Sequence, residues 1–365
     1  MEFVNTFWAL VPPIVAIGLA LITKETYSSL FIGIVVGALF IAGMNPIGAL
    51  DTMINDGFIA AVADGWNAGI FLFLVILGIM VALINAAGVS ASCGKWAAKH
   101  VHTKMGALLA TFLLGVLIFV DDYFNCLTVG SVMRPVTDLQ KVSRAKMAYI
   151  IDATAAPICM IDPVSSWAAA VSATAADLDS GISGIQLFIQ AIPFNFYSLL
   201  TIVFVIGRTV MGFDYGPMAK AELEAMQGNL GALGEEEEVN VPKSSLWDML
   251  IPVIALIVCC IAGMMYVGGF WSGASLIDSF ADTDASVGLP WGSMIALIFT
   301  FIYLLCRRVV TFKEATACIV KGFNAMVPAR LILTFALTLK NMTGALGAAE
   351  YVAGLMDTAS KGLYS

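Results

Sequence analysis

The chain consists of long apolar runs separated by short polar segments, and this pattern predicts helices that cross a lipid bilayer. Several runs reach the roughly 20 residues that a helix needs to span the hydrocarbon core. A transmembrane barrel would show short strands of alternating polarity, and blocks such as Ile70–Ile84 do not alternate. We therefore expect an all-α polytopic membrane protein with spans at Phe7–Ile22, Tyr27–Ala42, Asn67–Ala87, Ala145–Ala176, Ile185–Ile206, Trp247–Val267, Leu289–Cys306 and Asn324–Leu339.

One further apolar stretch, Met105–Val132, is expected to enter and leave the membrane on the same side. Basic residues flank it at Lys95, Lys99, Lys104, Arg134, Lys141, Arg144 and Lys146. The positive-inside rule therefore places both of its ends in the cytoplasm. Its expected arms, Met105–Val120 and Cys126–Val132, are each shorter than a span, and polar residues lie between them. The pattern predicts a re-entrant hairpin over residues 105–133 with a charged tip.

The run Ala145–Ala176 is too long for one straight span, because a helix rises about 1.5 Å per residue. Pro157 and Pro163 interrupt it on either side of Cys159–Asp162, so we expect a broken helix. The other loop charges place the N-terminus outside and the loop of residues 213–246 in the cytoplasm, in a multi-pass protein of the cell (inner) membrane. The expected outer loops include the one that carries Asp51, Asp56 and Asp64.

Two short correspondences suggest an internal duplication. Trp8 and Pro13 match Trp247 and Pro252, and Gly65-Trp66-Asn67-Ala68 matches Gly322-Phe323-Asn324-Ala325. The matched segments run in opposite directions by their loop charges, which is the inverted arrangement of many secondary transporters; chance matches in so biased a composition are the alternative. We expect a first repeat at 1–212, an acidic linker at 213–246 with Glu235–Glu238, and a second repeat at 247–365. By the spacing of the first repeat, the second hairpin falls beyond Ser365, so the second repeat is incomplete here.

Composition narrows the class of protein. Of the 365 residues, 60% are hydrophobic and 12% are charged, against about 25% charged in soluble domains, which excludes a soluble globule. The net charge of -8 comes largely from Glu235–Glu238 and from loop aspartates, so it provides no basic surface for nucleic acid. The seven cysteines lack the paired spacing of a zinc site or of a disulfide framework, and we expect no cofactor.

The hairpin tip carries the sharpest chemical signal. Asp121 and Asp122 are adjacent carboxylates at membrane depth, where ionisable groups are costly and are therefore functional candidates. If a helix restarts at the tip, Asn125 falls on the face of Asp121, and Thr128 lies on an adjacent turn. Such oxygens suit a hard cation like Na⁺ better than a soft metal. The alternative is that Asp121 or Asp122 only caps the second arm.

A second group of polar residues lies on the expected broken helix. Pro163 prevents regular hydrogen bonding, so nearby backbone carbonyls are free to coordinate a cation. The side chains that could join them are those of Asp152, Thr154, Asp162, Ser165 and Ser166. Two alternatives stay open: the two serines could cap the restarted helix, and Asp152 could pair with Arg144 or Lys146. The candidate Na⁺ ligands are Asp121, Asp122, Asn125 and Asp162.

A carboxylate that binds Na⁺ can also hold a proton, because desolvation and a neighbouring like charge favour its neutral form. Na⁺ and H⁺ would then compete for one site, and which aspartate carries the proton stays open. Alternating exposure of such a site to the two sides of the membrane is sufficient for antiport.

Two groups of motifs surround these residues. At the hairpin they are Phe119-Val120-Asp121-Asp122-Tyr123-Phe124-Asn125, Val129-Gly130-Ser131, Arg134-Pro135 and Ser143-Arg144-Ala145-Lys146; on the broken helix they are Asp152-Ala153-Thr154-Ala155-Ala156-Pro157 and Asp162-Pro163-Val164-Ser165-Ser166-Trp167. Together they resemble the NhaC-type sodium/proton antiporter family of the ion transporter superfamily. The resemblance implies two inverted repeats, each with a hairpin and a broken helix, and elevator-like movement of that core. The missing second hairpin, which in such proteins supplies the other half of the site, is the departure from the family pattern.

The sequence therefore predicts a sodium-coupled secondary active transporter, most simply a Na⁺/H⁺ antiporter, and not an enzyme. The alternatives are a sodium- or proton-coupled transporter of an organic acid or amino acid, an ion channel, a non-functional fragment and, remotely, an intramembrane aspartyl hydrolase. The expected partners are the lipid bilayer and Na⁺ and H⁺ or a small organic solute, with no nucleic acid. Whether the chain forms a homodimer stays open.

Overall fold

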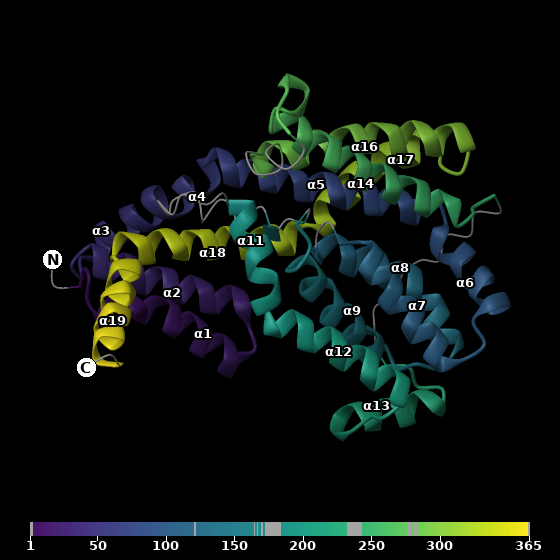
Figure 1. Ribbon diagram of the computed structural model, residues 1–365, viewed down its shortest axis with the longest axis horizontal. Helices are drawn as coiled ribbons and strands as arrows, with labels where there is room; N and C mark the ends of the chain where they lie inside the picture. Colours follow the sequence, from purple (N-terminus) through teal and green to yellow (C-terminus); the bar gives the residue numbers. More distant parts are fainter. Residues whose placement is uncertain are drawn as a thin grey trace. The chain divides into compact units, whose positions relative to one another are not determined.

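The structure is a computed structural model that describes residues 3–119, 122–163, 165, 167–168, 171, 184–231, 243–275, 279 and 283–363. All regular elements in these ranges are helical, as the sequence predicts (Figure 1). The chain divides into two compact units, of which unit 1 comprises Met1–Phe71 and Met326–Ser365 and unit 2 comprises Leu72–Ala325. Each unit contains segments of both expected repeats, and the repeat boundaries stay a prediction.

Unit 1 is built around two apolar helices that pack together, α2 (Thr26–Ile41) and α18 (Val327–Ala345) (Figure 1). Ile34 and Met342 are completely buried in their common core. Gly37 permits this close approach, because a Cβ at that position would lie 2.9 Å from the Cβ of Met342. The unit also contains η1 (Phe7–Leu10), α1 (Val11–Thr23), α3 (Pro46–Thr52), α4 (Ala60–Ala63), the first turns of α5 (Gly65–Ala86), and α19 (Ala348–Leu363).

A π-helix, η2 (Met53–Ile59), joins α3 to α4. The amide of Ala60 donates to the carbonyl of Asn55, five residues earlier, which is the π-helical pattern. The whole segment Pro46–Ala63 forms a helix pair with α2 that is bent by 116°. The expectation of a loop around Asp51 and Asp56 is therefore wrong: the segment is helical because its apolar residues pack on α18, which overrides the scattered aspartates. That it lies outside the membrane stays a prediction.

The hairpin of unit 2 consists of α7 (Lys104–Leu117) and α8 (Asp122–Leu139). At its base, the side chain of Gln140 donates a 2.9 Å hydrogen bond to the carbonyl of Val101, so the two ends of the hairpin meet. Before it lies α6 (Val89–His100), and after it comes α9 (Arg144–Cys159), which packs against both arms. The second arm is longer than the expected Cys126–Val132, because the polar residues on either side of the apolar run are also helical.

The expected span Ile185–Ile206 is wrong as a single helix. It contains α11 (Gly184–Ala191), η3 (Ile192–Phe194) and α12 (Phe196–Met211), with a bend of 52°. Pro193 lies in the short 3₁₀ turn, and the side chain of Asn195 caps α12 by accepting a 3.2 Å hydrogen bond from the amide of Ser198. The expected linker that follows also contains a helix, α13 (Gly216–Met226), whereas Glu235–Glu238 lies outside the described residues.

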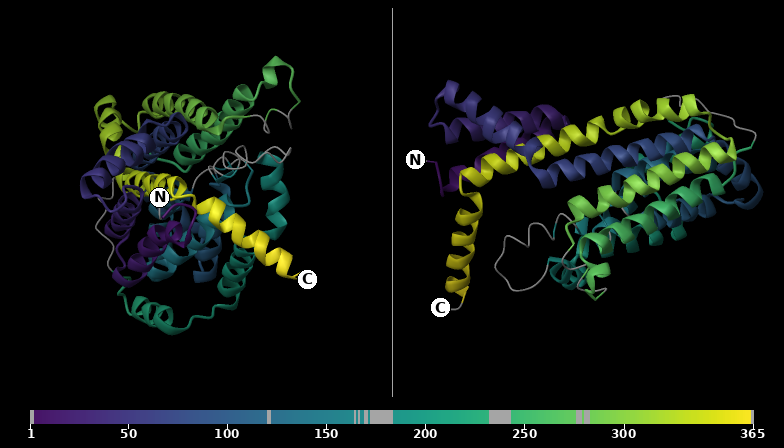
Figure 2. Two further views of the ribbon diagram at one scale, coloured as in Figure 1. Left: turned by 90° about the vertical axis from the view of Figure 1, so that its left-hand side faces the viewer. Right: turned by 90° about the horizontal axis from the view of Figure 1, so that it is seen from above.

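Helices α14 (Trp247–Val267) and α16 (Ala285–Arg307) run side by side in unit 2 (Figure 2). Glycines allow their backbones to touch: a Cβ on Gly263 would lie 2.5 Å from the carbonyl oxygen of Gly288, and one on Gly292 would overlap the carbonyl of Cys259. The short η4 (Phe270–Ser272) follows α14, and α17 (Phe312–Ala325) follows α16.

Four helical stretches in the described ranges have the length and composition of membrane spans, and the number rises to six if each bent pair is one span. They are Gly65–Ala86, Trp247–Val267, Ala285–Arg307 and Phe312–Ala345. The expected spans at Asn67–Ala87, Trp247–Val267 and Leu289–Cys306 are thereby confirmed as helices of spanning length. The expected Asn324–Leu339 is only part of a longer helical stretch, and Phe7–Thr23 is apolar but short.

Candidate ion-binding site

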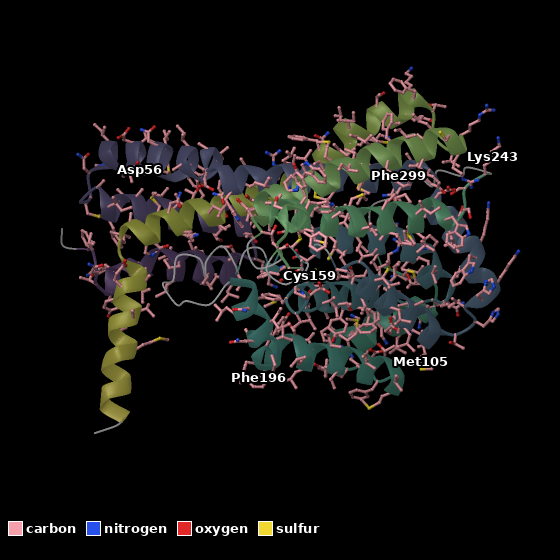
Figure 3. All side chains as sticks on the ribbon, turned by 45° about the horizontal axis from the view of Figure 1, so that its top comes forward. Asp56, Met105, Cys159, Phe196, Lys243 and Phe299 are labelled. Atoms are coloured by element: carbon pink, nitrogen blue, oxygen red, sulfur yellow. The ribbon has the colours of Figure 1, made fainter. Side chains whose placement is uncertain are left out.

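Asn125 joins the two arms of the hairpin near its tip. Its side-chain amide donates hydrogen bonds of 2.6 Å to the carbonyl of Gly115 and 2.7 Å to that of Ile118, both at the end of α7. These bonds satisfy carbonyl groups that the end of a helix leaves unpaired. Figure 3 labels Met105 at the base of the hairpin and Cys159 in the region of its tip. The sequence placed Asn125 among the ligands, but its amide also has this structural role.

Two buried oxygen atoms in the tip half of the hairpin have no hydrogen-bond partner among the described residues. They are Asn125 Oδ1 and Thr128 Oγ1, on side chains that are 0% and 1% exposed. The two residues are three positions apart on α8 and therefore lie on the same side of the helix. A buried polar group without a partner costs free energy, so two of them close together indicate a place where a ligand supplies the missing interaction.

Asp122 lies in the first turn of α8. Its carboxylate interacts with the backbone of Asp122 and Tyr123 and with the side chain of Trp167. A negative charge is favourable at a helix N-terminus, and the capping role that the sequence left open stays a prediction. The Trp167 contact connects the hairpin tip to the residues that follow the break in α9.

The end of α9 lies against the hairpin, and most of the second half of the expected broken helix lies outside the described residues. The thiol of Cys159 donates a 3.1 Å hydrogen bond to the carbonyl of Phe119. A Cβ on Gly115 would lie 3.0 Å from Thr154 Cγ2 and 3.7 Å from Asn125 Oδ1, so Thr154 borders the same region. The Thr154 hydroxyl itself donates to the carbonyl of Ile150.

Ser165 and Asp162 lie in the break after α9. The hydroxyl of Ser165 has one proton to donate, and the carbonyls of Cys159 and Asp162 both lie within reach of it, at 2.5 and 2.8 Å; its oxygen accepts a 3.2 Å hydrogen bond from the amide of Ala168. This is the capping geometry that the sequence left open as the alternative to ion binding. Asp162 is half-buried beside it. Two other candidates, Asp121 and Ser166, lie outside the described residues.

Asp152 lies on the face of α9 toward α12. It is exposed in a cavity of about 620 Å³ that is also lined by Tyr149, Tyr197 and Thr201. The alternative pairing with Arg144 or Lys146 is not seen within the described residues: Arg144 pairs with Asp138 at 3.3 Å, and Lys146 pairs with Asp214 at 2.6 Å. The Asp152 carboxylate is near enough to that of Asp122 for the two charges to interact.

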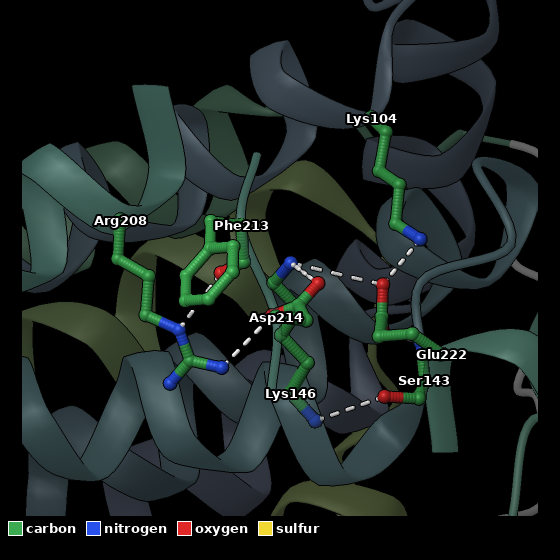
Figure 4. Close-up of polar contacts among 7 residues, drawn as sticks. All are labelled: Lys104, Ser143, Lys146, Arg208, Phe213, Asp214 and Glu222. Carbon is green, nitrogen blue, oxygen red and sulfur yellow. Dashed lines mark hydrogen bonds and ion pairs between the residues drawn. The ribbon is translucent and has the colours of Figure 1, made fainter. Parts of the chain in front are cut away.

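Sequence reasoning missed a charged cluster at the base of the hairpin, which we call the base clamp: Lys104, Lys146, Arg208, Asp214 and Glu222 (Figure 4). Burial alone would raise the pKa of Asp214, but the hydrogen bonds and charges of Lys146 and Arg208 outweigh it and hold that pKa below its usual value. In the sequence, Lys104 and Lys146 indicate only the topology of the hairpin, apart from the possible pairing of Lys146 with Asp152. Lys146 and Asp214 are 68 positions apart in sequence, so no local pattern links such partners.

Within the described ranges, no three His, Cys, Asp or Glu side chains gather as a metal site. The oxygens at the hairpin tip come instead from amide, hydroxyl and carboxylate groups, which suit a hard cation.

The fold and the tip together define a helical membrane protein with a polar helix hairpin packed against α9. A sequence model of the Na⁺/H⁺ antiporter family matches residues 158–364. An uncharacterized protein of Haemophilus influenzae is 31% identical over 370 residues, a match that covers 98% of this chain and 71% of the relative. No solved structure matches the chain. The chain belongs to the Na⁺/H⁺ antiporter family, which confirms the resemblance of its motifs; the family is one of transporters rather than enzymes.

Proposed function

We propose that the protein is a sodium-coupled secondary transporter that exchanges Na⁺ for H⁺ at the hairpin tip. The observation that carries this proposal is the pair of buried oxygens without partners among the described residues, Asn125 Oδ1 and Thr128 Oγ1. A Na⁺ ion that has lost its water needs several oxygen ligands, and these two atoms need a partner. Family membership supports the same cargo.

The other candidate residues have different roles in this proposal. Asp122 supplies the negative charge beside the two neutral oxygens, and Asp121 is its candidate partner. Asp162, Thr154, Ser165 and Ser166 belong to the break in α9 and would contribute oxygen atoms there. Asp152 faces the cavity between α9 and α12, where it would exchange protons or ions with water.

Exchange follows from competition for one charge. A proton on Asp122 removes the charge that attracts Na⁺, so the site holds one cation or the other. Movement of the hairpin and α9 as a unit would expose the site to each side of the membrane in turn, which is alternating access of the elevator type. In this arrangement the hairpin is re-entrant, its base and the loop of residues 213–246 face the cytoplasm, and the N-terminus lies outside.

The test is proton movement in proteoliposomes that enclose a pH-sensitive dye. An inward Na⁺ gradient should make the lumen alkaline with the native protein and not with Asp122→Asn. Thr128→Val should raise the Na⁺ concentration for half-maximal exchange about ten-fold, the effect of losing about 1.4 kcal/mol of binding. Thr137→Val is the control, because the hydroxyl of Thr137 already bonds to the carbonyl of Met133.

Unchanged rate and Na⁺ dependence in both tip variants would remove the tip from the mechanism. A native protein that moves no protons but accumulates an organic acid or amino acid in a Na⁺ gradient would favour the organic-solute alternative. Thiol labelling of His100→Cys and Gln140→Cys tests the hairpin itself, since both positions should react from the same side of the membrane.

A further inference from the structure

The base clamp is a chain of alternating charges. Lys104 pairs with Glu222, which also lies 3.7 Å from Lys146; Lys146 pairs with Asp214 at 2.6 Å, and Asp214 pairs with Arg208 at 2.8 Å (Figure 4). Glu222 and Lys146 are only 4% and 3% exposed. Charges so far from water are tolerated only when they are paired, so each member depends on its neighbours.

Each member of the clamp comes from a different part of unit 2. Lys104 begins α7, Lys146 lies in the first turn of α9, Arg208 lies in the last turn of α12, and Glu222 is on α13. Glu222 also accepts a 2.8 Å hydrogen bond from the amide of Ser143, the residue that caps α9. One carboxylate of α13 thereby holds the starts of two other helices.

The same helices are also joined at the opposite end. There the Cys159 thiol bonds to the carbonyl of Phe119, and the side chain of Asn195 donates a 3.3 Å hydrogen bond to the carbonyl of Met160. The hairpin, α9 and α12 are thus connected at both of their ends. Elements joined at two ends cannot tilt against one another without breaking one set of contacts.

We propose that Glu222 is a positioning residue of transport, and that α13 travels with the hairpin, α9 and α12 as one body. This inference rests on the proposed exchange function and adds a residue remote from the ion. Glu222 does not contact the ion: it transmits movement by keeping the base of the hairpin attached to α9. Loss of its charge therefore slows the movement and leaves the affinity of the tip unchanged.

Glu222→Gln keeps an oxygen for the Ser143 amide and removes the charge that pairs with the lysines. We expect its maximal exchange rate to fall about ten-fold, as a rise of about 1.4 kcal/mol in the barrier to movement would cause, with the half-saturating Na⁺ concentration unchanged. Glu224→Gln, at an exposed position on the same helix, should match the native protein. An unchanged rate, or a change in Na⁺ affinity alone, would overturn the proposal.

A second experiment does not depend on that variant. Lys104→Cys with Glu222→Cys should exchange slowly, and a short methanethiosulfonate crosslinker that joins the two positions should restore the rate. If α13 must release the hairpin during transport, the crosslink will stop exchange and its reduction will restore the slow rate, which overturns the proposal. The native protein with the same reagent controls for its own cysteines. A native protein without any exchange contradicts the proposed function instead.

Discussion

The thiol of Cys159 donates a 3.1 Å hydrogen bond to the carbonyl of Phe119, so the last residue of α9 holds the chain that leads into the hairpin tip. Because a thiol is a weak hydrogen-bond donor, this contact matters more for where it lies than for its strength.

Two substitutions of Cys159 should distinguish the stabilising effect of its hydrogen bond from that of its packing. Cys159→Ala removes the donor and should lower the free energy of unfolding by about 1 kcal/mol, whereas Cys159→Ser keeps a donor and should cost less. Thermal unfolding of the purified protein in detergent measures both. Equal losses in the two variants would assign the effect to the volume of the sulfur atom.

Substitutions at Asn125 and Thr128 should have different effects on the stability of the protein. Asn125→Leu leaves the buried carbonyls of Gly115 and Ile118 without donors, at about 1–3 kcal/mol each. Thr128→Val removes a hydroxyl that has no partner among the described residues, so stability should hold or rise. Thermal unfolding without Na⁺ compares the two; a large loss in Thr128→Val would mean that its hydroxyl is already satisfied.

The contact between α14 and α16 should tolerate no added carbon. Gly292→Ala places a Cβ on the carbonyl of Cys259, and rigid backbone must move to make room, at about 1–3 kcal/mol. Gly130→Ala is the matched control, because its Cβ would meet nothing nearer than 4.0 Å. Equal melting temperatures for the two variants would contradict the close helix contact.

Asp214 should contribute to stability in a pH-dependent way. Its pKa is lower in the folded protein than in the unfolded chain, so its contribution is complete above the unfolded value of about 3.9 and is lost as the pH falls through the lower folded value. Asp214→Asn should therefore be less stable than the native protein at neutral pH, and the difference should shrink in acid. Melting curves over that range measure it, and a constant difference would exclude the ion pairs as its cause.

Apolar periodicity predicted the helices well where one run makes one helix. Trp247–Val267 agrees with α14 at both ends, because polar residues precede the run and Gly268 and Gly269 follow it. Apolar periodicity failed as a guide where helices continue through polar residues, as in Pro46–Ala63. It also failed where a short turn divides one apolar run, as at Pro193. In both cases packing or a local turn decides the structure, and hydropathy does not record either.

The sequence indicates where the candidate site lies, but it says less about the role of each residue in it. Adjacent acids and Asn125 signalled the hairpin tip, but only the structure shows that Asn125 joins the arms and that Ser165 caps a helix. The base clamp could not have been found, because it joins residues from distant segments through burial.

The π-helix Met53–Ile59 has a consequence for comparisons within the family. A π turn holds one residue more than the α turn that it replaces, as if a single residue had been inserted into a continuous helix. Aligned relatives are therefore expected to differ in length by one residue at this point, and those with the shorter version should carry an ordinary α-helix there.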